Sequence, residues 1–556
     1  MRETDAGVAW TPVTRAQFRN DVEQLAAGLS RLGIKPGDRV LTMVGTRYEW
    51  EVADKGVMLC GAVAVAVDLK STDADIAYIV TQAGVSAAIV EDETQVAKLP
   101  PDFADTATAT IVIRAEHGAL PGIHRFAELL AARDGTAEIR DTARPDTLAA
   151  ILFTSGTTGK PKGIPFGHRQ LACGCPIMAE FLAGHIAPGD TTLTWLPLNN
   201  ATGRFISMMC LYFGVRQYFL SDPKRLPEAI GKVNPHLFFG VPRLFEKIHD
   251  GLRRKFATQS PPVRILLDGI IRLRQRVHGS LVAPLVDRLM IHAIREKVFG
   301  PNIRLLFCGS APIHPKILAF FQGLGARIIE CYGFSENAIL VAMNRPDDIR
   351  IGTVGPPLPG NTIRISPEGE LRVKSEALFE GYLNDSDRAQ LFDEEGFYRT
   401  GDLVQIDDGA LRIVGRSREI IKTSNGVRIS PVEVENAYRA IPFLEHVVAI
   451  GDNRPYLVGL VTIDEQAFRT YVEDKGIDVS NTEPQGSSPR VRDILLREWE
   501  RVGQPLAPNK RLRRVIALAE RFSVESGELT PTLKLRRGVI SKKYGDQIER
   551  IYGESS

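Results

Sequence analysis

The sequence has 556 residues, of which 44% are hydrophobic and 24% are charged, and its formal net charge is +2. A chain of this length exceeds the size at which one hydrophobic core keeps growing, so we expect at least two domains. The ordinary composition argues against general disorder, and the near-neutral charge gives no support for nucleic acid as a partner.

The six cysteines are scattered among apolar or glycine neighbours, which indicates reduced, buried thiols. Cys173 and Cys175 form a C-x-C pair, but no second pair with zinc-like spacing accompanies them, so we expect no zinc site there. The N-terminus lacks an apolar run, and no stretch approaches 18 apolar residues. We therefore expect a cytoplasmic protein without a transmembrane segment.

The first part of the chain alternates helical and strand patterns. A capping-box spacing from Thr14 to Gln17, apolar residues at helical intervals and a stop signal at Gly33 predict the first helix. After it, β-branched runs alternate with helical patterns in the order 39–44, 49–59, 62–67, 73–82 and 87–90. This βαβ rhythm is typical of a parallel, doubly wound sheet, so the predicted fold class is α/β.

The pattern changes near residue 350. Glycine and proline crowd residues 352–360, and short strands with tight turns follow, including a predicted hairpin over 403–414 with Asp-Gly at its tip. A helix is predicted to begin at residues 430–433, which offer an N-cap serine, a proline at the first helical position and a capping-box glutamate. These changes indicate a β subdomain followed by a separate C-terminal domain.

Residues 152–163 carry the strongest chemical signal. They read Leu-Phe-Thr-Ser-Gly-Thr-Thr-Gly-Lys-Pro-Lys-Gly and overlap the end of an apolar run at 148–153. Backbone amides, hydroxyls and ammonium groups in such a loop can surround phosphate oxygens. A Walker A loop does not fit, because Thr154 stands where the first glycine is required and Pro161 where serine or threonine is required. The predicted phosphate-binding residues are Thr154, Ser155, Gly156, Thr157, Thr158, Gly159, Lys160 and Lys162.

This segment resembles the phosphate loop of the adenylate-forming superfamily, which comprises acyl-CoA synthetases, luciferases and peptide-synthetase adenylation domains. Further motifs follow in the family's order: adenine-binding strand ends at 309–312 and 330–337, a ribose motif at 398–402, a hinge at 415–419 and a catalytic-lysine segment at 530–534. The resemblance implies a ligase that uses ATP, Mg²⁺ and coenzyme A.

The resemblance also implies roles for individual residues. Asp402 would accept both ribose hydroxyls, and Glu336 together with Thr154 would hold Mg²⁺ through hard oxygen atoms. Lys534 would stabilise charge that develops between the carboxylate and the α-phosphate, so the implied catalytic residues are Lys534, Glu336 and Thr154. Because these residues are present, a noncatalytic nucleotide-binding regulator is disfavoured. The implied nucleotide-binding set further contains Gly309, Ser310, Ala311, Glu330, Cys331, Tyr332, Gly333, Ser335, Asp402 and Arg416.

The same resemblance implies the domain organisation. Residues 1–415 would form a large domain with doubly wound mixed sheets and the β subdomain, residues 416–419 a hinge with Arg418, and residues 420–556 a small, mobile α+β domain. After adenylation this domain would rotate, remove Lys534 from the site and present a loop to the incoming thiol. The implied thiol-acceptor residues are Asn425, Gly426 and Arg428.

Two segments, 240–248 and 527–537, resemble the long-chain fatty acyl-CoA ligase branch; the first contains Val-Pro-Arg-x-x-Glu-Lys. The predicted reaction converts a medium- or long-chain fatty acid to acyl-AMP and then to acyl-CoA. The alternative is an adenylating ligase that passes a non-fatty acid to an amine or to a carrier-protein thiol. The acyl-pocket candidates are Asn200, Val241, Gly309 and Gly333.

Three positions depart from the family pattern. Asn200 stands where the long-chain branch has His, Gly203 where it has Glu, and Arg418 where the hinge usually has Lys or Asp. A neutral amide and a missing carboxylate cannot titrate as the usual pair does, so we expect an altered acyl pocket. Segment 252–297 has ten Lys and Arg against three Asp and Glu. It is either a peripheral contact with an anionic membrane or a solvated face.

Overall fold

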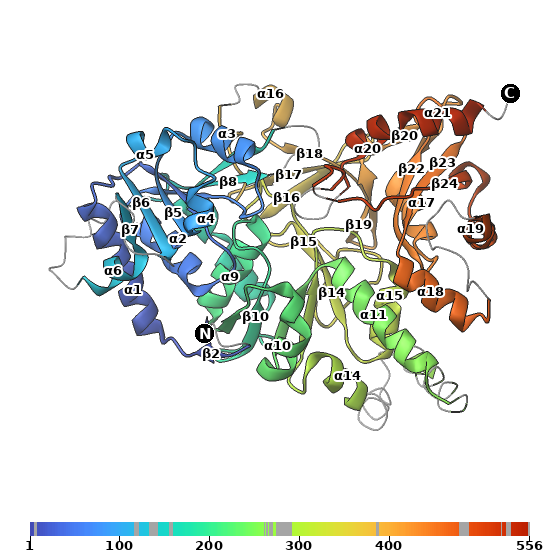
Figure 1. The fold of residues 1–556 in the computed structure, drawn as a ribbon, viewed down its shortest axis with the longest axis horizontal. Coiled ribbons are helices and arrows are strands. Elements are labelled where there is room, and N and C mark those ends of the chain that lie inside the picture. Colours follow the sequence, from blue (N-terminus) through green and yellow to red (C-terminus); the bar gives the residue numbers. More distant parts are fainter. Residues whose placement is uncertain are drawn as a thin grey trace.

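The computed structural model describes residues 1–4, 8–115, 122–132, 143–154, 160–260, 262, 265, 269, 271–273, 292–384, 388–477, 489–523, 525–529 and 535–553. Most of the predicted phosphate loop (155–159), the segment of Lys534 (530–534) and parts of segment 252–297 lie outside these residues. Two mixed sheets form most of the molecule, a smaller antiparallel sheet lies beside them, and the C-terminal elements lie at the opposite end from α1 (Figure 1).

The first sheet lies in the N-terminal part of the molecule. Its order is β7-β6-β5-β3-β4-β8-β9, and neighbours run parallel except at the edge strand β9. The strands are β3 (Arg39–Met43), β4 (Val63–Ala66), β5 (Val85–Asp92), β6 (Ala109–Arg114), β7 (Ile123–Arg125), β8 (Leu148–Thr154) and β9 (Lys162–Gly167). Its helices are α1 (Arg15–Arg31), α2 (Tyr48–Leu59), α3 (Asp73–Ala83), α4 (Glu93–Val96), α5 (Phe103–Thr106) and α6 (Phe126–Ala131).

The predicted elements of this sheet are confirmed, each within two residues of its expected bounds. The capping box at the start of α1 is also confirmed, because the Thr14 hydroxyl accepts from Gln17 N at 3.1 Å and the Gln17 amide oxygen accepts from Thr14 N at 2.8 Å. Gly33 lies in the left-handed region with φ 92°, which ends the helix.

The second sheet has the order β11-β10-β12-β13-β14-β15, and only β15 pairs antiparallel among the described strands. Its strands are β10 (Thr191–Thr194), β11 (Arg216–Phe219), β12 (Leu237–Gly240), β13 (Leu305–Cys308), β14 (Ile328–Tyr332) and β15 (Ala342–Met343). Its helices are α8 (Gly174–Phe181), α9 (Ala201–Phe213), η1 (Pro223–Arg225), α10 (Leu226–Val233), α11 (Pro242–Ala257), α14 (His292–Phe299) and α15 (Pro315–Gly323). The short helix α7 (His168–Ala172) follows β9 and packs through Leu171 in the core of the first sheet. The short strands β1 (Arg2–Glu3) and β2 (Trp10–Thr11) pair with each other.

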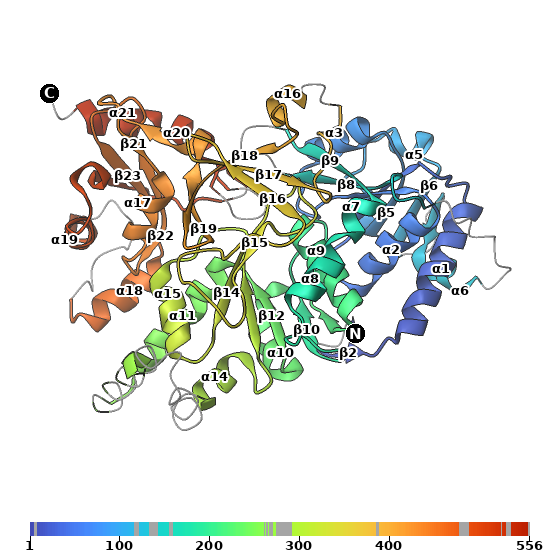
Figure 2. The same ribbon diagram turned by 180° about the vertical axis from the view of Figure 1, so that it is seen from behind.

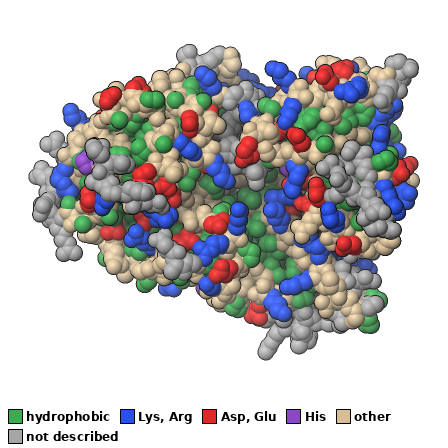
Figure 3. All heavy atoms as spheres, in the orientation of Figure 1, with side chains coloured by type: hydrophobic (Ala, Val, Ile, Leu, Met, Phe, Trp, Pro, Cys, Tyr) green, Lys and Arg blue, Asp and Glu red, His purple; other side chains and the backbone are tan. Residues whose placement is uncertain are grey.

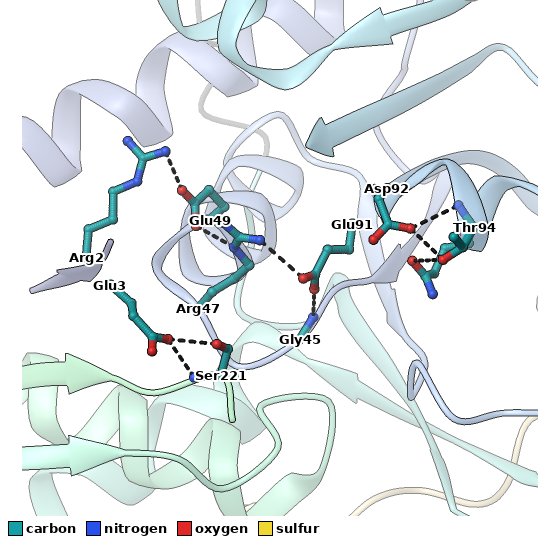
Figure 4. Close-up of polar contacts among 10 residues, drawn as sticks. Arg2, Glu3, Gly45, Arg47, Glu49, Glu91, Asp92, Thr94 and Ser221 are labelled. Atoms are coloured by element: carbon teal, nitrogen blue, oxygen red, sulfur yellow. Dashed lines mark hydrogen bonds and ion pairs between the residues drawn. The ribbon is translucent and has the colours of Figure 1, made fainter. Parts of the chain in front are cut away.

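A chain of ion pairs secures the turn that follows β3 (Figure 4). Arg47 contacts Glu49 at 2.8 Å and Glu91 at 3.2 Å, and Glu91 also accepts from Gly45 N at 2.7 Å. Arg2 contacts the same Glu49 at 2.6 Å. The first strand, the turn after β3 and the end of β5 are therefore held together by charge-assisted contacts.

Helix α9 packs against both sheets, since it contributes Met208 to the core of the first sheet and Met209 and Cys210 to a core of the second. On this helix Arg204 makes an ion pair with Asp54 of α2, and both side chains are buried. Burial lowers the pKa of Arg204 to about 10. A charge in a core needs a counter-charge, and Arg204 has the ion pair with Asp54 and the attraction of nearby Glu51.

The third sheet is antiparallel, in the order β16-β17-β18-β19. It consists of β16 (Asn361–Ile365), β17 (Glu370–Ser375), β18 (Tyr398–Asp407) and β19 (Ala410–Arg416), with α16 (Arg388–Leu391) before β18. Asp408 and Gly409 both have positive φ, at 48° and 79°, which is the geometry of a tight hairpin turn. The predicted Asp-Gly hairpin is therefore confirmed.

The C-terminal part contains the sheets β20-β21 and β22-β23-β24 with helices around them (Figure 2). The strands are β20 (Ile421–Lys422), β21 (Arg428–Ile429), β22 (Leu444–Ile450), β23 (Leu457–Ile463) and β24 (Leu512–Ala517). The helices are η3 (Ser417–Glu419), α17 (Pro431–Tyr438), α18 (Glu465–Asp474), α19 (Pro489–Gly503), η4 (Pro508–Lys510), α20 (Arg537–Lys543) and α21 (Gly545–Gly553). The expected division into 1–415, 416–419 and 420–556 stays a prediction.

The predicted capping box at the start of α17 is wrong. Ser430 is the N-cap and Pro431 the first helical residue, but the Ser430 side chain makes no capping hydrogen bond. Its hydroxyl instead donates to Val414 O of β19 at 2.7 Å. The hydroxyl of Ser430, which the local pattern assigned to the cap of α17, is therefore used in a tertiary hydrogen bond to β19.

None of the described helices combines the length and the apolar composition needed to cross a membrane. On the face in Figure 3, the described acidic and basic side chains are interspersed, in keeping with the near-neutral net charge. Exposed apolar side chains in the described part of segment 252–297 include Ile265 and Leu273. This segment's membrane contact stays a hypothesis.

Replacing Asp54 by alanine should destabilise the protein by about 3–5 kcal/mol, because Arg204 would lose its ion-pair partner in the core and keep only its attraction to Glu51. The double variant Asp54→Leu with Arg204→Met should recover most of that loss. Urea unfolding followed through Trp50, whose ring lies 5.4 Å from the Arg204 guanidinium, measures both. If the free energy of unfolding of Asp54→Ala lay within about 1 kcal/mol of the parent value, as is usual for surface substitutions, the role of this pair would be contradicted.

Candidate functional site

The predicted adenine-binding segments lie side by side at the carboxyl ends of β13 and β14. These strands are parallel neighbours with Cys308 opposite Glu330, so residues 309–311 leave the sheet beside Cys331. A Cβ atom on Gly309 would lie 3.0 Å from Cys331 Sγ and 3.2 Å from Cys331 O, so only glycine fits without a shift of its neighbours. Gly333 and Ser335 follow in the segment after β14.

Asp402 is a buried carboxylate at the centre of a polar cluster. The Tyr332 hydroxyl donates to Asp402 Oδ2 at 2.5 Å, and Arg416 Nε donates to Oδ1 at 3.1 Å. Arg416 stands opposite Asp402 in the pairing of β18 with β19. Burial, and then the neighbouring Asp402 carboxylate, raise the pKa of Tyr332, so its phenol stays a donor. Each carboxylate oxygen keeps a lone pair, so Asp402 can accept hydroxyl groups from a sugar.

Lys160 and Lys162 lie on aromatic faces where the phosphate loop rejoins the sheet. Thr154 at the end of β8 pairs with Lys162 at the start of β9, so the loop spans two neighbouring antiparallel strands. Lys162 Nζ lies 4.5 Å from the ring centroid of Tyr382, and Lys160 Nζ lies 4.8 Å from that of Tyr78. A cavity of about 270 Å³ adjoins them, lined by Tyr78, Gln82, Phe153, Pro161, Lys162, Gly163, Tyr382, Leu383 and Asn384.

Glu336 lies at the end of a chain of hydroxyl groups. The Tyr382 hydroxyl donates to Glu336 Oε1 at 2.5 Å, and the hydroxyls of Tyr382 and Tyr398 are 3.4 Å apart. Tyr382 was not among the predicted site residues, because a tyrosine after Gly381 in a loop belongs to none of the sequence motifs. Its proximity to Glu336, 46 positions away, is set by the tertiary structure alone.

Whether Mg²⁺ can be held at this site depends on the oxygen donors that the side chains offer. Within the described ranges no three His, Cys, Asp or Glu side chains gather as a metal cage. Mg²⁺ in nucleotide enzymes is usually held by one or two carboxylates together with phosphate oxygens. Glu336 supplies a hard oxygen of that kind beside the lysine-rich end of the phosphate loop, so the residues present fit a nucleotide-bound Mg²⁺.

The acyl-pocket candidates occupy the starts of helices and the ends of strands. Asn200 is the N-cap of α9, and Val241 is the N-cap of α11. One turn into α9, a Cβ atom on Gly203 would lie 2.1 Å from Pro197 O. The glutamate that the long-chain branch carries at this position cannot fit unless the backbone near Pro197 moves. The backbone conformation near Pro197 therefore requires glycine at position 203, where the long-chain branch has glutamate.

The hinge and the thiol-acceptor candidates are close in sequence and joined to the C-terminal helices. Arg418 lies in η3, and its neighbour Glu419 contacts Arg537 of α20 at 3.5 Å. Arg537 also contacts the buried Glu435 of α17. The exposed residues Asn425, Gly426 and Arg428 form the turn into β21. Lys534 lies outside the described residues.

Glu330 is the central residue of β14, and its side chain is buried. Its Oε2 accepts from Gly352 N at 3.3 Å. Burial raises the pKa of its carboxyl to about 8. The structure therefore places a carboxyl that stays protonated at neutral pH directly before Cys331.

The chain matches the model of the AMP-binding enzyme family over residues 4–383. Long-chain-fatty-acid–CoA ligase FadD15 of Mycobacterium bovis is 31% identical, over 98% of this chain and 93% of its own length. Long-chain-fatty-acid–CoA ligase 5 of Rattus norvegicus is 27% identical, over 97% of this chain and 84% of its own length.

Solved structures share the fold. The adenylation domain of a carboxylate reductase from Mycobacterium chelonae has a TM-score of 0.76 at 21% identity, covering 98% of this chain and 85% of that one. The anthranilate CoA ligase AuaEII, solved with anthranoyl-AMP, has a TM-score of 0.72 at 19% identity, covering 95% of this chain and 91% of that one. At these identities the likeness shows the α/β adenylation fold.

Glu330 makes the stability of the protein depend on pH. Its pKa is raised on folding, so its favourable contribution is full below about pH 4.5 and is lost as the pH rises through about 8. Glu330→Gln stays neutral, and at pH 9 it should be more stable than the parent, relative to pH 5, by on the order of 1–4 kcal/mol. Urea midpoints of both proteins at pH 5, 7 and 9 test this. A stability difference that does not change with pH would be evidence against a buried neutral carboxyl.

Proposed function

The chain belongs to the AMP-binding enzyme family, and from this we infer that it activates a fatty acid with ATP and transfers the acyl group to coenzyme A. The observation that carries this proposal is the 31% identity to a long-chain-fatty-acid–CoA ligase over 98% of the chain. The site supports it, because the buried Asp402 carboxylate, which accepts from Tyr332 and Arg416, has the geometry to accept the hydroxyls of a ribose as well. The enzyme is thus an AMP-forming acid–thiol ligase.

In the first step a carboxylate oxygen of the acid attacks the α-phosphorus of ATP, and the bond from that phosphorus to the pyrophosphate oxygen breaks. We assign Asp402 to the ribose, and Thr154, Lys160 and Lys162 to the phosphates. These side chains work by positioning the reactants and by stabilising negative charge on the leaving pyrophosphate. When bound through Glu336, Mg²⁺ would neutralise part of the same charge.

In the second step the thiol sulfur attacks the acyl carbon, the bond to the phosphate oxygen breaks, and AMP leaves while the thiol proton passes to solvent. We assign Lys534 to the first step and the loop with Asn425, Gly426 and Arg428 to the second. A rotation at residues 416–419, with Arg418, would exchange them. We place the reaction in the cytoplasm, where ATP and coenzyme A are both abundant.

The expected products with ATP, Mg²⁺, coenzyme A and a panel of acids are acyl-CoA, AMP and pyrophosphate, with medium- or long-chain fatty acids preferred over aromatic acids. Mass spectrometry of the reaction mixtures identifies both the acid and the acceptor. AMP or acyl adenylate without any CoA product would instead indicate an amine or a carrier-protein thiol as acceptor. Absence of AMP with every acid would refute the ligase function.

Lys534→Ala should reduce adenylation by roughly 100-fold or more, because the developing charge at the α-phosphate loses its cation. Thioester formation from a preformed acyl adenylate should change by less than about threefold, since the lysine leaves the site before that step. Rapid-quench measurement of each half-reaction separates them, and Lys542→Ala in α20 is a matched control for loss of a C-terminal lysine. Equal losses in both steps would contradict this division of labour.

A further inference from the structure

Residues 377–384 connect the two parts of the site that would surround the triphosphate. At one end, Phe379 N donates to Glu336 O at 2.8 Å, and Ala377 O accepts from Ala338 N at 2.9 Å. At the other end, Leu383 N donates to Gly163 O at 2.8 Å. Glu336 follows the second sheet and Gly163 belongs to β9 of the first. This segment is therefore a backbone connection between the two sheets.

Tyr382 makes the corresponding side-chain connection. Its hydroxyl donates to Glu336 Oε1 at 2.5 Å, and its ring face carries Lys162 Nζ at 4.5 Å from the centroid. Its ring packs edge-on against Phe379 with centroids 4.9 Å apart. Burial and the nearby carboxylate raise the pKa of Tyr382, so the phenol keeps its proton. One aromatic side chain therefore contacts both a carboxylate and an ammonium group of the site.

The two contacts constrain different groups in different ways. A phenol that donates to one oxygen of Glu336 restrains the orientation of the carboxylate and leaves the other oxygen for a metal ion, as outer-shell donors commonly do. The negative face of the ring attracts the Lys162 ammonium and so fixes where that charge lies. Since Tyr382 is itself held by its backbone neighbours and by Phe379, the separation between carboxylate and ammonium is set in advance.

We propose that Tyr382 is a positioning residue for adenylation, which orients Glu336 toward the divalent cation of the nucleotide and holds Lys162 beside the phosphates. The proposal rests on the proposed function, and it adds a residue outside the motifs of the phosphate loop, the adenine segments and the ribose segment. It predicts that the hydroxyl and the ring of Tyr382 have separable effects, the hydroxyl on the metal ion and the ring on the nucleotide.

Tyr382→Phe and Tyr382→Leu in the full chain separate these effects. Tyr382→Phe removes the donor to Glu336 and keeps the ring under Lys162, so the Mg²⁺ concentration for half-maximal adenylation should rise roughly tenfold while the KM for the acid stays unchanged. Tyr382→Leu removes both contacts, so nucleotide affinity should also fall about two- to fivefold. Tyr471→Phe is the matched control, because it removes a phenol donor to Glu498 in the C-terminal part.

Binding is measured apart from catalysis. Calorimetric titration with a non-hydrolysable ATP analogue, in EDTA and at graded Mn²⁺, should show normal affinity for Tyr382→Phe in EDTA and a weakened gain from Mn²⁺. Tyr382→Leu should bind weakly in both. A metal dependence of Tyr382→Phe equal to that of the parent would overturn the proposal, and so would an equal change in Tyr471→Phe. If the parent forms no AMP with any acid, the proposed function fails, whereas the titration still decides the role of Tyr382.

Discussion

The relative position of the two large sheets is the constraint on which the site depends. The first sheet supplies Thr154 and Lys162, whereas the second supplies Tyr332 and Glu336. Helix α9 lies between the sheets, and its Arg204 is paired with Asp54 of α2 in an environment that excludes water. A buried pair of this kind is directional, unlike apolar packing, so it specifies how the sheets meet more than it adds to net stability. The residues proposed to bind the phosphates, on the first sheet, are then held at a fixed distance from those proposed to bind the base, on the second.

The third sheet contributes the buried carboxylate of Asp402 to the site formed by the two large sheets. Asp402 lies in β18, but its two oxygens are held by Tyr332 of β14 and by Arg416 of β19. The carboxylate is therefore oriented before any sugar arrives, and little side-chain entropy remains to be lost on binding. Arg416 is also the last residue of β19, directly before η3. The orientation of the proposed ribose acceptor, Asp402, and the start of the expected hinge thus depend on the same side chain, that of Arg416.

Much of the fold could be predicted because its signals are local. The alternation of strands and helices before residue 92, the capping box at Thr14 and the Asp-Gly hairpin depend on residues a few positions apart, and the structure confirms them. The motifs also brought Tyr332 and Asp402 into one site. Tyr382 was missed because its partner Glu336 is 46 positions away. Ser430 was assigned to the wrong partner because a distant carbonyl competes for its hydroxyl. Periodicity and spacing encode neither kind of contact.

The close approach of the Pro197 carbonyl to Gly203 limits which residues position 203 can hold. The Pro197 carbonyl occupies the space that any side chain at position 203 needs, with a Cβ atom only 2.1 Å away. Introducing the glutamate of the long-chain branch by one substitution would therefore cause a clash with the backbone. The turn at 197–200 must change at the same time. A side chain at position 203 therefore requires residues 197–203 to be rebuilt as one unit.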